Sequence, residues 1–171
     1  MITNLSFPGN SDAESVFKII IEQVSSSIHI SYMDIKRPWG GFLVIDEHDI
    51  DLFIYQYFPH LTKEDLGDGK LSPKILIVEP GKRLSWQYHN RRAEIWKVIG
   101  GQVGVITSHT DIESEKKILL TGEVIELEKG ERHRLIGLQD WGIVAEIWRH
   151  TDSGNPSDEE DIIRIQDDFG R

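Results

Sequence analysis

Hydrophobic residues recur every three or four positions between residues 11 and 25. This period of about 3.6 residues predicts a helix that packs one apolar face across a sheet. Ser11 and Glu14 have the spacing of a capping box, in which two side chains satisfy free amides at a helix start. The residues on the apolar face are Val16, Phe17, Ile20, Ile21 and Val24.

From residue 28 onward, the pattern changes to short runs rich in β-branched and aromatic residues, separated by turn residues. Many short strands joined by glycine-containing turns are typical of an antiparallel sandwich or barrel. We therefore predict an all-β fold with the helix packed outside it. The candidate strands are IHISY (28–32), GFLVID (41–46), IYQYF (54–58), KILIVE (74–79), RLSWQYH (83–89), EIWKVIGGQVGVIT (94–107), KKILLTGEVIELE (116–128), RHRLIGL (132–138) and GIVAEIWRH (142–150).

Two polar segments interrupt the strand pattern. Residues 59–73 contain two glycines and two prolines and predict a long surface loop. Residues 151–161 form an acidic linker that precedes a last short apolar run, IIRIQ.

Composition limits the partners of the protein and the chemistry of any site. The 171-residue chain has a net charge of −10, which argues against nucleic acid as a partner because polyanions need a surplus of Lys and Arg. No apolar run approaches the roughly 20 residues that span a bilayer, and no secretory signal is visible. We therefore expect a cytoplasmic protein that does not bind membranes. The chain has no cysteine, so nitrogen and oxygen atoms must hold any metal ion.

The stretch RLSWQYHNRRAEIW (83–96) carries the most informative polar residues. Because residues two apart in a strand share a face, Arg83, Gln87 and His89 should point the same way. The polar turn after His89 should return Glu94 to the same side of a hairpin. An amide oxygen, an imidazole and a carboxylate in one place suit a divalent metal ion.

Glycines and a second histidine extend this pattern along the chain. The first stretch contains Gly81, Gln87, His89, Glu94 and Gly101, and the second contains Gly122, Gly130 and His133. In the intervals between these residues, the two stretches resemble the paired motifs of the cupin superfamily. Glu128 stands where proline is usual in that family, and Gly137 stands where asparagine is usual. The resemblance implies an antiparallel double-stranded β-helix, the cupin jelly roll, with an N-terminal helix.

The resemblance narrows to the cupin-type, or type II, mannose-6-phosphate isomerase domain, which is often fused to a mannose-1-phosphate guanylyltransferase. Residues 83–96 match most fixed positions of its pattern R-L-S-x-Q-x-H-x-H-R-x-E-H-W. RPWG (37–40) resembles the entry of that domain, and EEDIIRIQDDFGR (159–171) resembles its closing E-D-D-I-x-R-x-x-D-x-Y-G-R. These matches imply a cupin domain over 37–171, preceded by a helical and strand extension over 1–36.

The resemblance also implies a metal site and an activity. The ligands of the metal ion would be Gln87, His89, Glu94 and His133. The enzyme would interconvert an aldose phosphate and a ketose phosphate of the mannose 6-phosphate and fructose 6-phosphate type. We expect one divalent ion, zinc, and the donor set also suits manganese, iron, cobalt or nickel. We expect a homodimer because open sheet edges in small β proteins need covering.

Aldose–ketose isomerisation requires a base that moves a proton between two carbon atoms. Lys74, at the start of KILIVE, is one candidate because a partly buried lysine can have a depressed pKa. Glu146 in GIVAEIW is a second candidate, since a charge inside an apolar run needs a reason. Each also has a plain structural interpretation, a solvated strand end for Lys74 and an ion pair for Glu146.

Arginines are the natural ligands of a substrate phosphate. Arg83 should point inward with the metal ligands, which is costly unless it meets an anion. Arg92 and Arg171 match family positions and are further candidates, with Arg171 also counted among the catalytic residues. Arg132 and Arg134 flank the histidine of the second motif, so strand alternation makes them surface charges.

The chain departs from the isomerase pattern at Asn90, Arg91 and Ile95, where the family usually has histidine or aromatic residues. If a family histidine moves a proton, this protein does so differently or not at all. Two alternatives therefore stay open. One is a non-catalytic sugar-binding cupin that keeps its metal ion, and the other is a different cupin enzyme, such as an iron dioxygenase or a sugar epimerase.

Overall fold

The computed structural model describes residues 5–171, and within this range it contains eleven strands and two α-helices. The strands are β1 (Ile30–Arg37), β2 (Gly40–Ile45), β3 (Leu71–Val78), β4 (Trp86–Tyr88), β5 (Arg92–Gly100), β6 (Gln102–Ser108), β7 (Lys117–Leu120), β8 (Val124–Leu127), β9 (Arg132–Gly137), β10 (Gly142–His150) and β11 (Ile163–Gln166). The α-helices are α1 (Ala13–Ser25) and α2 (Ile50–Tyr57), and three short 3-10 helices are η1 (Glu47–Asp49), η2 (Glu64–Leu66) and η3 (Glu159–Asp161).

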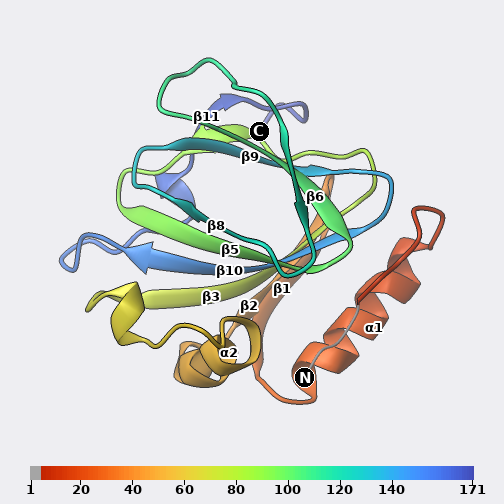
Figure 1. The fold of residues 1–171 in the computed structure, drawn as a ribbon, viewed down its shortest axis with the longest axis horizontal. Coiled ribbons are helices and arrows are strands. Elements are labelled where there is room, and N and C mark those ends of the chain that lie inside the picture. Colours follow the sequence, from red (N-terminus) through yellow and green to blue (C-terminus); the bar gives the residue numbers. More distant parts are fainter. Residues whose placement is uncertain (1–4) are drawn as a thin grey trace.

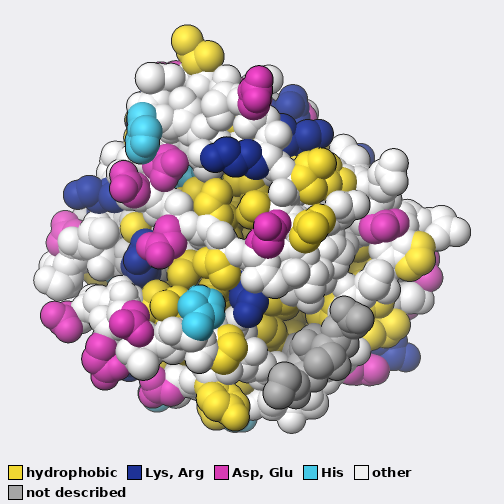
Figure 2. All heavy atoms as spheres, viewed as in Figure 1, with side chains coloured by type: hydrophobic (Ala, Val, Ile, Leu, Met, Phe, Trp, Pro, Cys, Tyr) yellow, Lys and Arg dark blue, Asp and Glu magenta, His cyan; other side chains and the backbone are white. Residues whose placement is uncertain are grey.

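The strands form two antiparallel sheets that lie face to face (Figure 1). One sheet has the order β1-β2-β3-β10-β5-β8, and the other has the order β11-β4-β9-β6-β7. Both helices lie outside the sheets, on the side of β1, β2 and β3 (Figure 1). The predicted all-β jelly roll with an external helix is confirmed. In the same view, Figure 2 shows hydrophobic side chains between the two sheets and charged side chains of both signs around them.

The central strands β3 and β10 of the six-stranded sheet are buried on both faces. On β3, Ile75 and Ile77 point outward into a core that includes residues of both helices. Leu76 and Val78 alternate with them and point into the core between the two sheets. A strand buried on both faces reads as a continuous apolar run, which explains the sequence KILIVE. The inner face of this sheet is the face that carries the candidate site.

Helix α1 begins one residue later than the capping-box spacing indicated. Asp12, not Ser11, is its N-cap, because the Asp12 carboxylate accepts a hydrogen bond from the Ser15 amide at 2.9 Å. The apolar face of α1 packs as predicted on the outer core, with Val16, Phe17, Ile20 and Val24 all buried.

The predicted strand over residues 54–58 is wrong, because these residues belong to α2 and the turn after it. Their aromatic and β-branched composition favoured a strand, but the apolar positions follow a helical period that starts earlier. The buried residues of α2 are Ile50, Phe53, Ile54 and Tyr57. The following predicted loop is also shorter than expected, since it contains η2 and ends where β3 begins at Leu71.

The N-terminal extension shares the core of the sheets. Leu5 and the apolar face of α1 belong to the same buried cluster as Leu43 of β2 and Ile77 of β3. The division of the chain at residue 37 stays a prediction, and residues 1–4 of the predicted extension lie outside the described residues. Within residues 5–171, neither helix has both the length and the apolar character that crossing a membrane requires.

We predict that Phe53→Ala lowers the free energy of unfolding by about 3–5 kcal/mol, because the Phe53 side chain is fully buried under the sheet. Tyr55→Ala is the matched control on the same helix. Its side chain is 78% exposed, so the change should stay within about 0.5 kcal/mol. Urea denaturation of both variants measures this difference. A loss from Tyr55→Ala as large as that from Phe53→Ala would contradict the helical assignment of α2.

Candidate metal centre

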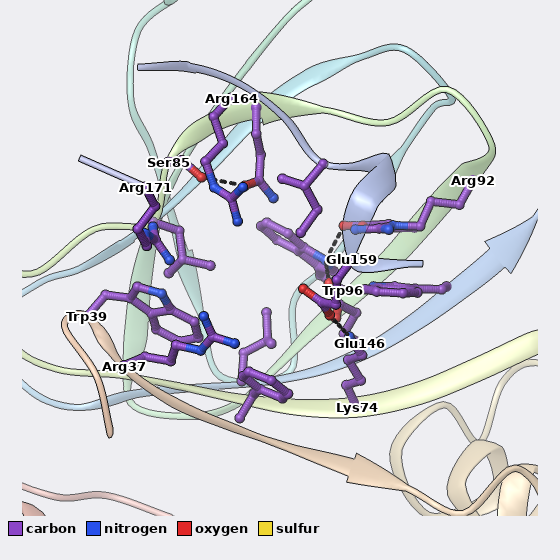
Figure 3. Close-up of a pocket in the computed structure, with 17 residues that line it drawn as sticks. Arg37, Trp39, Lys74, Ser85, Arg92, Trp96, Glu146, Glu159, Arg164 and Arg171 are labelled. Atoms are coloured by element: carbon purple, nitrogen blue, oxygen red, sulfur yellow. Dashed lines mark hydrogen bonds and ion pairs between the residues drawn. The ribbon is translucent and has the colours of Figure 1, made fainter. Parts of the chain in front are cut away.

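A pocket opens between the two sheets and is lined by inward-pointing side chains (Figure 3). Its empty volume is about 550 Å³, including the part open to solvent. The polar side chains come from segments far apart in the sequence. They include Arg37, Lys74, Gln87, Arg92, Glu94, Glu146, Glu159, Arg164 and Arg171.

His89, Glu94 and His133 form a compact buried group beside this pocket. One potential ligand atom from each residue lies within 4.8 Å of the others. The two histidine Nε2 atoms are 3.2 Å apart, and His89 Nε2 is also 3.2 Å from Glu94 Oε1. His133 Nε2 is 3.6 Å from Glu94 Oε2. The structure therefore brings together three of the four predicted metal ligands, and this group can hold a metal ion.

Backbone carbonyls determine which ring nitrogens face the centre of the group. His89 Nδ1 is 3.2 Å from the carbonyl oxygen of Asp161, and His133 Nδ1 is 2.9 Å from that of Glu131. A carbonyl oxygen only accepts hydrogen bonds, so each Nδ1 carries the ring hydrogen. Burial lowers the pKa of both histidines, to about 3 for His89, so both rings are neutral at pH 7. Each Nε2 thus offers a lone pair, and two facing lone pairs beside a carboxylate fit a divalent cation.

Glu94 is a fully buried carboxylate. Its Oε1 accepts a hydrogen bond from Arg92 Nε at 2.7 Å, and its Oε2 accepts one from Trp96 Nε1 at 3.1 Å. Burial by itself would raise the pKa of Glu94, but the two histidines and Arg92 hold it below its ordinary value. Arg92 Nη2 also lies 3.1 Å from His89 Nε2. Because His89 Nε2 has only one lone pair, a metal ion bound to it would replace the hydrogen bond from Arg92 Nη2.

Gln87, the fourth predicted ligand, lies on β4 directly opposite His133 of β9. Its side chain lines the pocket, and its Oε1 accepts a hydrogen bond from Ser85 Oγ. An amide oxygen has a second lone pair, so this contact leaves room for a metal bond. Its role as a ligand stays a prediction.

Glu146 is a second buried carboxyl group in the pocket. Its Oε1 accepts a hydrogen bond from Trp96 Nε1 at 2.9 Å. Burial and the charge of Glu94 together raise the pKa of Glu146 to about 8, although Lys74 and Arg92 offset part of their effect. Glu146 therefore exchanges its proton near neutral pH, as a general acid or base must.

Lys74 faces Glu146 across the β3–β10 pair, but its amino group is engaged elsewhere. Lys74 Nζ lies 3.0 Å from Glu159 Oε1 and 3.4 Å from the centre of the Trp148 ring. The Lys74 amino group therefore makes an ion pair and a cation–π contact. Of the two candidate bases, Glu146 has the pKa better suited to the role, and catalytic roles for both residues stay predictions.

The C-terminal segment holds the turn between β4 and β5 in place. The Asp161 carboxylate accepts hydrogen bonds from the amides of Asn90 and Arg91 at 3.1 and 3.0 Å, and from Ser157 Oγ at 2.7 Å. The Asp161 carbonyl is also the partner of His89 Nδ1. Groups of this kind behind a ligand orient it for a metal ion.

The predicted inward position of Arg83 is wrong. Regular strand geometry begins only at Trp86, and Arg83 makes an isolated bridge with Ile136. Alternation counted back from Gln87 therefore fails at residue 83. Arg83 Nε and Nη2 donate to the Asp168 carboxylate at 2.6 and 2.9 Å, and Arg83 is not among the residues that line the pocket.

The assignment of Arg134 as a surface charge is also wrong. Its side chain does point away from the pocket, but it is fully buried and pairs with Glu113. Gln166 of β11 also accepts from it through its backbone carbonyl at 3.2 Å, so neighbouring segments cover this outer face. Arg132 is partly buried, over the Tyr88 ring and paired with Asp111.

The structure adds two pocket arginines, Arg37 and Arg164, that the sequence prediction missed. Both lie inside segments that resemble the isomerase domain, RPWG and the C-terminal stretch. Their place in these segments was the signal that could have identified Arg37 and Arg164 as pocket residues. Strand alternation within one hairpin carries no information about them, because they lie on β1 and β11.

We predict that replacing His89 and His133 together with alanine removes stoichiometric metal from the purified protein. The replacement deletes both Nε2 lone pairs and leaves Glu94 and Gln87 as weak ligands. Elemental analysis measures the bound metal. The control is His48→Ala, because that side chain is 97% exposed and pairs only with Asp46 among residues 5–171. Unchanged metal content in the double variant would place the site elsewhere.

Known proteins resemble this chain in sequence and in fold. A family model described as mannose-6-phosphate isomerase C-terminal matches residues 54–167. The mannose-1-phosphate guanylyltransferase of Salmonella montevideo is 28% identical over 165 residues, which are 95% of this chain and 29% of that protein. The chain spans less than a third of the length of the curated relatives it matches first.

Solved structures resemble the fold at low sequence identity. Vicilin from Corylus avellana (hazelnut) aligns with a TM-score of 0.53 and 13% identity over 74% of this chain and 34% of that chain. A Cupin 2 conserved barrel domain protein from Salinispora arenicola CNS-205 aligns with a TM-score of 0.39 and 19% identity over 46% of this chain and 61% of that chain. Because the family model covers more than half of the chain, this protein belongs to the mannose-6-phosphate isomerase C-terminal family.

Proposed function

We propose that this protein is a metal-dependent isomerase that interconverts an aldose phosphate and a ketose phosphate. The observation that carries the proposal is a His–Glu–His metal group whose Glu94 lines the same pocket as the separate buried carboxyl group of Glu146. The family match and the guanylyltransferase relatives, whose name includes mannose 1-phosphate, support a phosphorylated sugar as the substrate.

Isomerisation of mannose 6-phosphate to fructose 6-phosphate moves one proton from C2 to C1 and another from O2 to O1. Glu146 is suited to take the carbon-bound proton and return it to the neighbouring carbon. Its raised pKa makes the Glu146 carboxylate a stronger base than an exposed glutamate, and the Trp96 hydrogen bond fixes its orientation. The charged groups of Lys74 and Arg92 flank the same region (Figure 3).

His89, Glu94, His133 and Gln87 would hold the metal ion. When bound, a divalent ion would polarise the substrate oxygens at C1 and C2 as a Lewis acid. Two imidazoles with oxygen ligands suit zinc, and manganese, iron, cobalt or nickel fit the same donors. Arg92 keeps Glu94 ionised and oriented toward both histidines, so its part is to support the ligands rather than to bind phosphate.

The three positions that depart from the family pattern, Asn90, Arg91 and Ile95, do not line the pocket. Ile95 lies on the outer face of β5, within the core shared with the helices. Arg91 pairs with Asp158 of the C-terminal segment, and neither Asn90 nor Arg91 lines the pocket. A histidine at position 95 would point away from the reaction centre by strand alternation. The pocket therefore retains what the proposed chemistry needs, which favours an enzyme over a non-catalytic sugar-binding protein.

A cytoplasmic location and a homodimer remain predictions from the sequence. Neither is needed for the chemistry, because every group discussed above comes from one chain.

We predict that Glu146→Gln lowers kcat by about 100-fold or more, because the amide cannot accept the proton yet keeps the size and the Trp96 contact. A coupled assay with mannose 6-phosphate and fructose 6-phosphate measures the rate. Glu126→Gln is the control, since that side chain is 62% exposed and pairs with Arg149 outside the pocket.

Wild-type protein that binds mannose 6-phosphate without turnover would reject the isomerase and favour the sugar-binding alternative. Turnover that is unchanged in Glu146→Gln would keep the isomerase and remove Glu146 as its base.

A further inference from the structure

Three arginines from distant segments converge on one side of the pocket. Arg37 ends β1, Arg164 lies on β11, and Arg171 is the last residue of the chain. Figure 3 shows all three on the side of the pocket opposite Glu146 and Lys74. We call Arg37, Arg164 and Arg171 the arginine wall. Such a concentration of positive charge is unexpected in a chain with a net charge of −10.

Two members of the wall are held by carboxylates that do not line the pocket. Arg37 Nε lies 2.8 Å from Asp34 Oδ2, an ion pair that lacks the alignment of a hydrogen bond. Arg171 Nη2 lies 2.8 Å from Asp167 Oδ1, and its Nε also donates to Asp167. These contacts orient both guanidinium groups and leave other donors directed to the pocket.

Arg164 has no such partner. Among residues 5–171 it makes no side-chain hydrogen bond and no ion pair, and its Nε is buried without an acceptor. Burial lowers the pKa of Arg164, and the charges of Arg171 and Arg37 lower it further, while Asp167 and Glu159 offset part of this effect. A partly buried guanidinium without an ion pair, beside two other arginines, is costly, so an anion bound among the three would stabilise the arrangement.

A fourth donor lies beside the arginine wall. Trp39 lines the pocket next to Arg37 and Arg171 (Figure 3), and its Nε1 is buried without a hydrogen-bond partner in the described chain. Buried N–H groups are nearly always satisfied, so an unpaired one at a pocket wall indicates an acceptor that binds there.

We propose that the arginine wall and Trp39 Nε1 bind the phosphate group of the substrate, at the opposite side of the pocket from Glu146. The inference rests on the proposed function only in placing a sugar phosphate in this pocket. A phosphate monoester offers three terminal oxygens and two negative charges to donors that approach from several directions. A carboxylate offers two coplanar oxygens and one charge, so it matches three guanidinium groups less well. The phosphate ligands are then Arg37, Arg164 and Arg171 in place of Arg83 and Arg92.

The test is isothermal titration calorimetry with three probes: mannose 6-phosphate, mannose and mannuronate. Wild-type protein should bind mannose 6-phosphate at least tenfold more tightly than either other sugar. Arg164→Gln should weaken mannose 6-phosphate binding by tenfold or more and leave mannose unchanged. Arg37→Gln should act in the same direction, which covers the case in which Arg164→Gln does not fold. Arg149→Gln is the matched control, because Arg149 pairs with Glu126 outside the pocket.

Equal binding of the three probes, or wild-type affinity for mannose 6-phosphate in both wall variants, would overturn the inference. Mannuronate as tight as mannose 6-phosphate would replace phosphate with a carboxylate. The two proposals fail separately in the coupled assay. Tight, wall-dependent binding without turnover removes only the isomerase, whereas turnover with an unchanged KM in Arg164→Gln removes only the phosphate site.

Discussion

A carboxylate with almost no access to water lies at the centre of this molecule, and the rest of the site is arranged around its charge. Glu94 is 2% exposed, and an isolated charge at such a position would be very costly. The Arg92 guanidinium and the Trp96 indole compensate it by direct hydrogen bonds. Burial raises the pKa of Glu146 and the charge of Glu94 adds to this effect, which separates the two carboxyl groups into one that stays ionised and one that exchanges a proton.

This arrangement needs a rigid frame, and the six-stranded sheet supplies it. Its outer face is sealed by α1 and α2, and its inner face holds Glu94 of β5 and Glu146 of β10 in neighbouring strands. The positions of these side chains therefore depend on strand register rather than on loop conformation. The C-terminal segment completes the frame, since Asp161 fixes the turn behind His89 and Arg164 reaches the far side of the pocket.

The sequence indicated the metal group mainly through its resemblance to the paired motifs of a known family, because local strand geometry relates only the residues of one hairpin. Two motifs with matching intervals indicated His89, Glu94 and His133, which the structure places within 4.8 Å of one another. Alternation failed for Arg83 because β4 is only three residues long and begins after it. Strand alternation predicts the direction of a side chain only inside a strand, and the residue pattern does not show where the strand begins.

Features that depend on distant segments were beyond the sequence argument. Arg134 is buried because Glu113 and β11 cover the outer face of β9. The residue pattern around Arg134 does not show that other segments lie over it. Arg37 and Arg164 belong to strands in different sheets, so nothing in either segment shows that they meet. The helix α2 was mistaken for a strand because its composition was weighed above its helical spacing.

The most direct test of the central claim is a crystal structure of the metal-loaded protein with anomalous diffraction recorded at the absorption edge of the bound metal. The account predicts one peak bonded to Nε2 of His89, Nε2 of His133 and the Glu94 carboxylate at about 2.0–2.2 Å, with Arg92 Nη2 displaced from His89. Ligation through either Nδ1, or a peak away from Glu94, would contradict it.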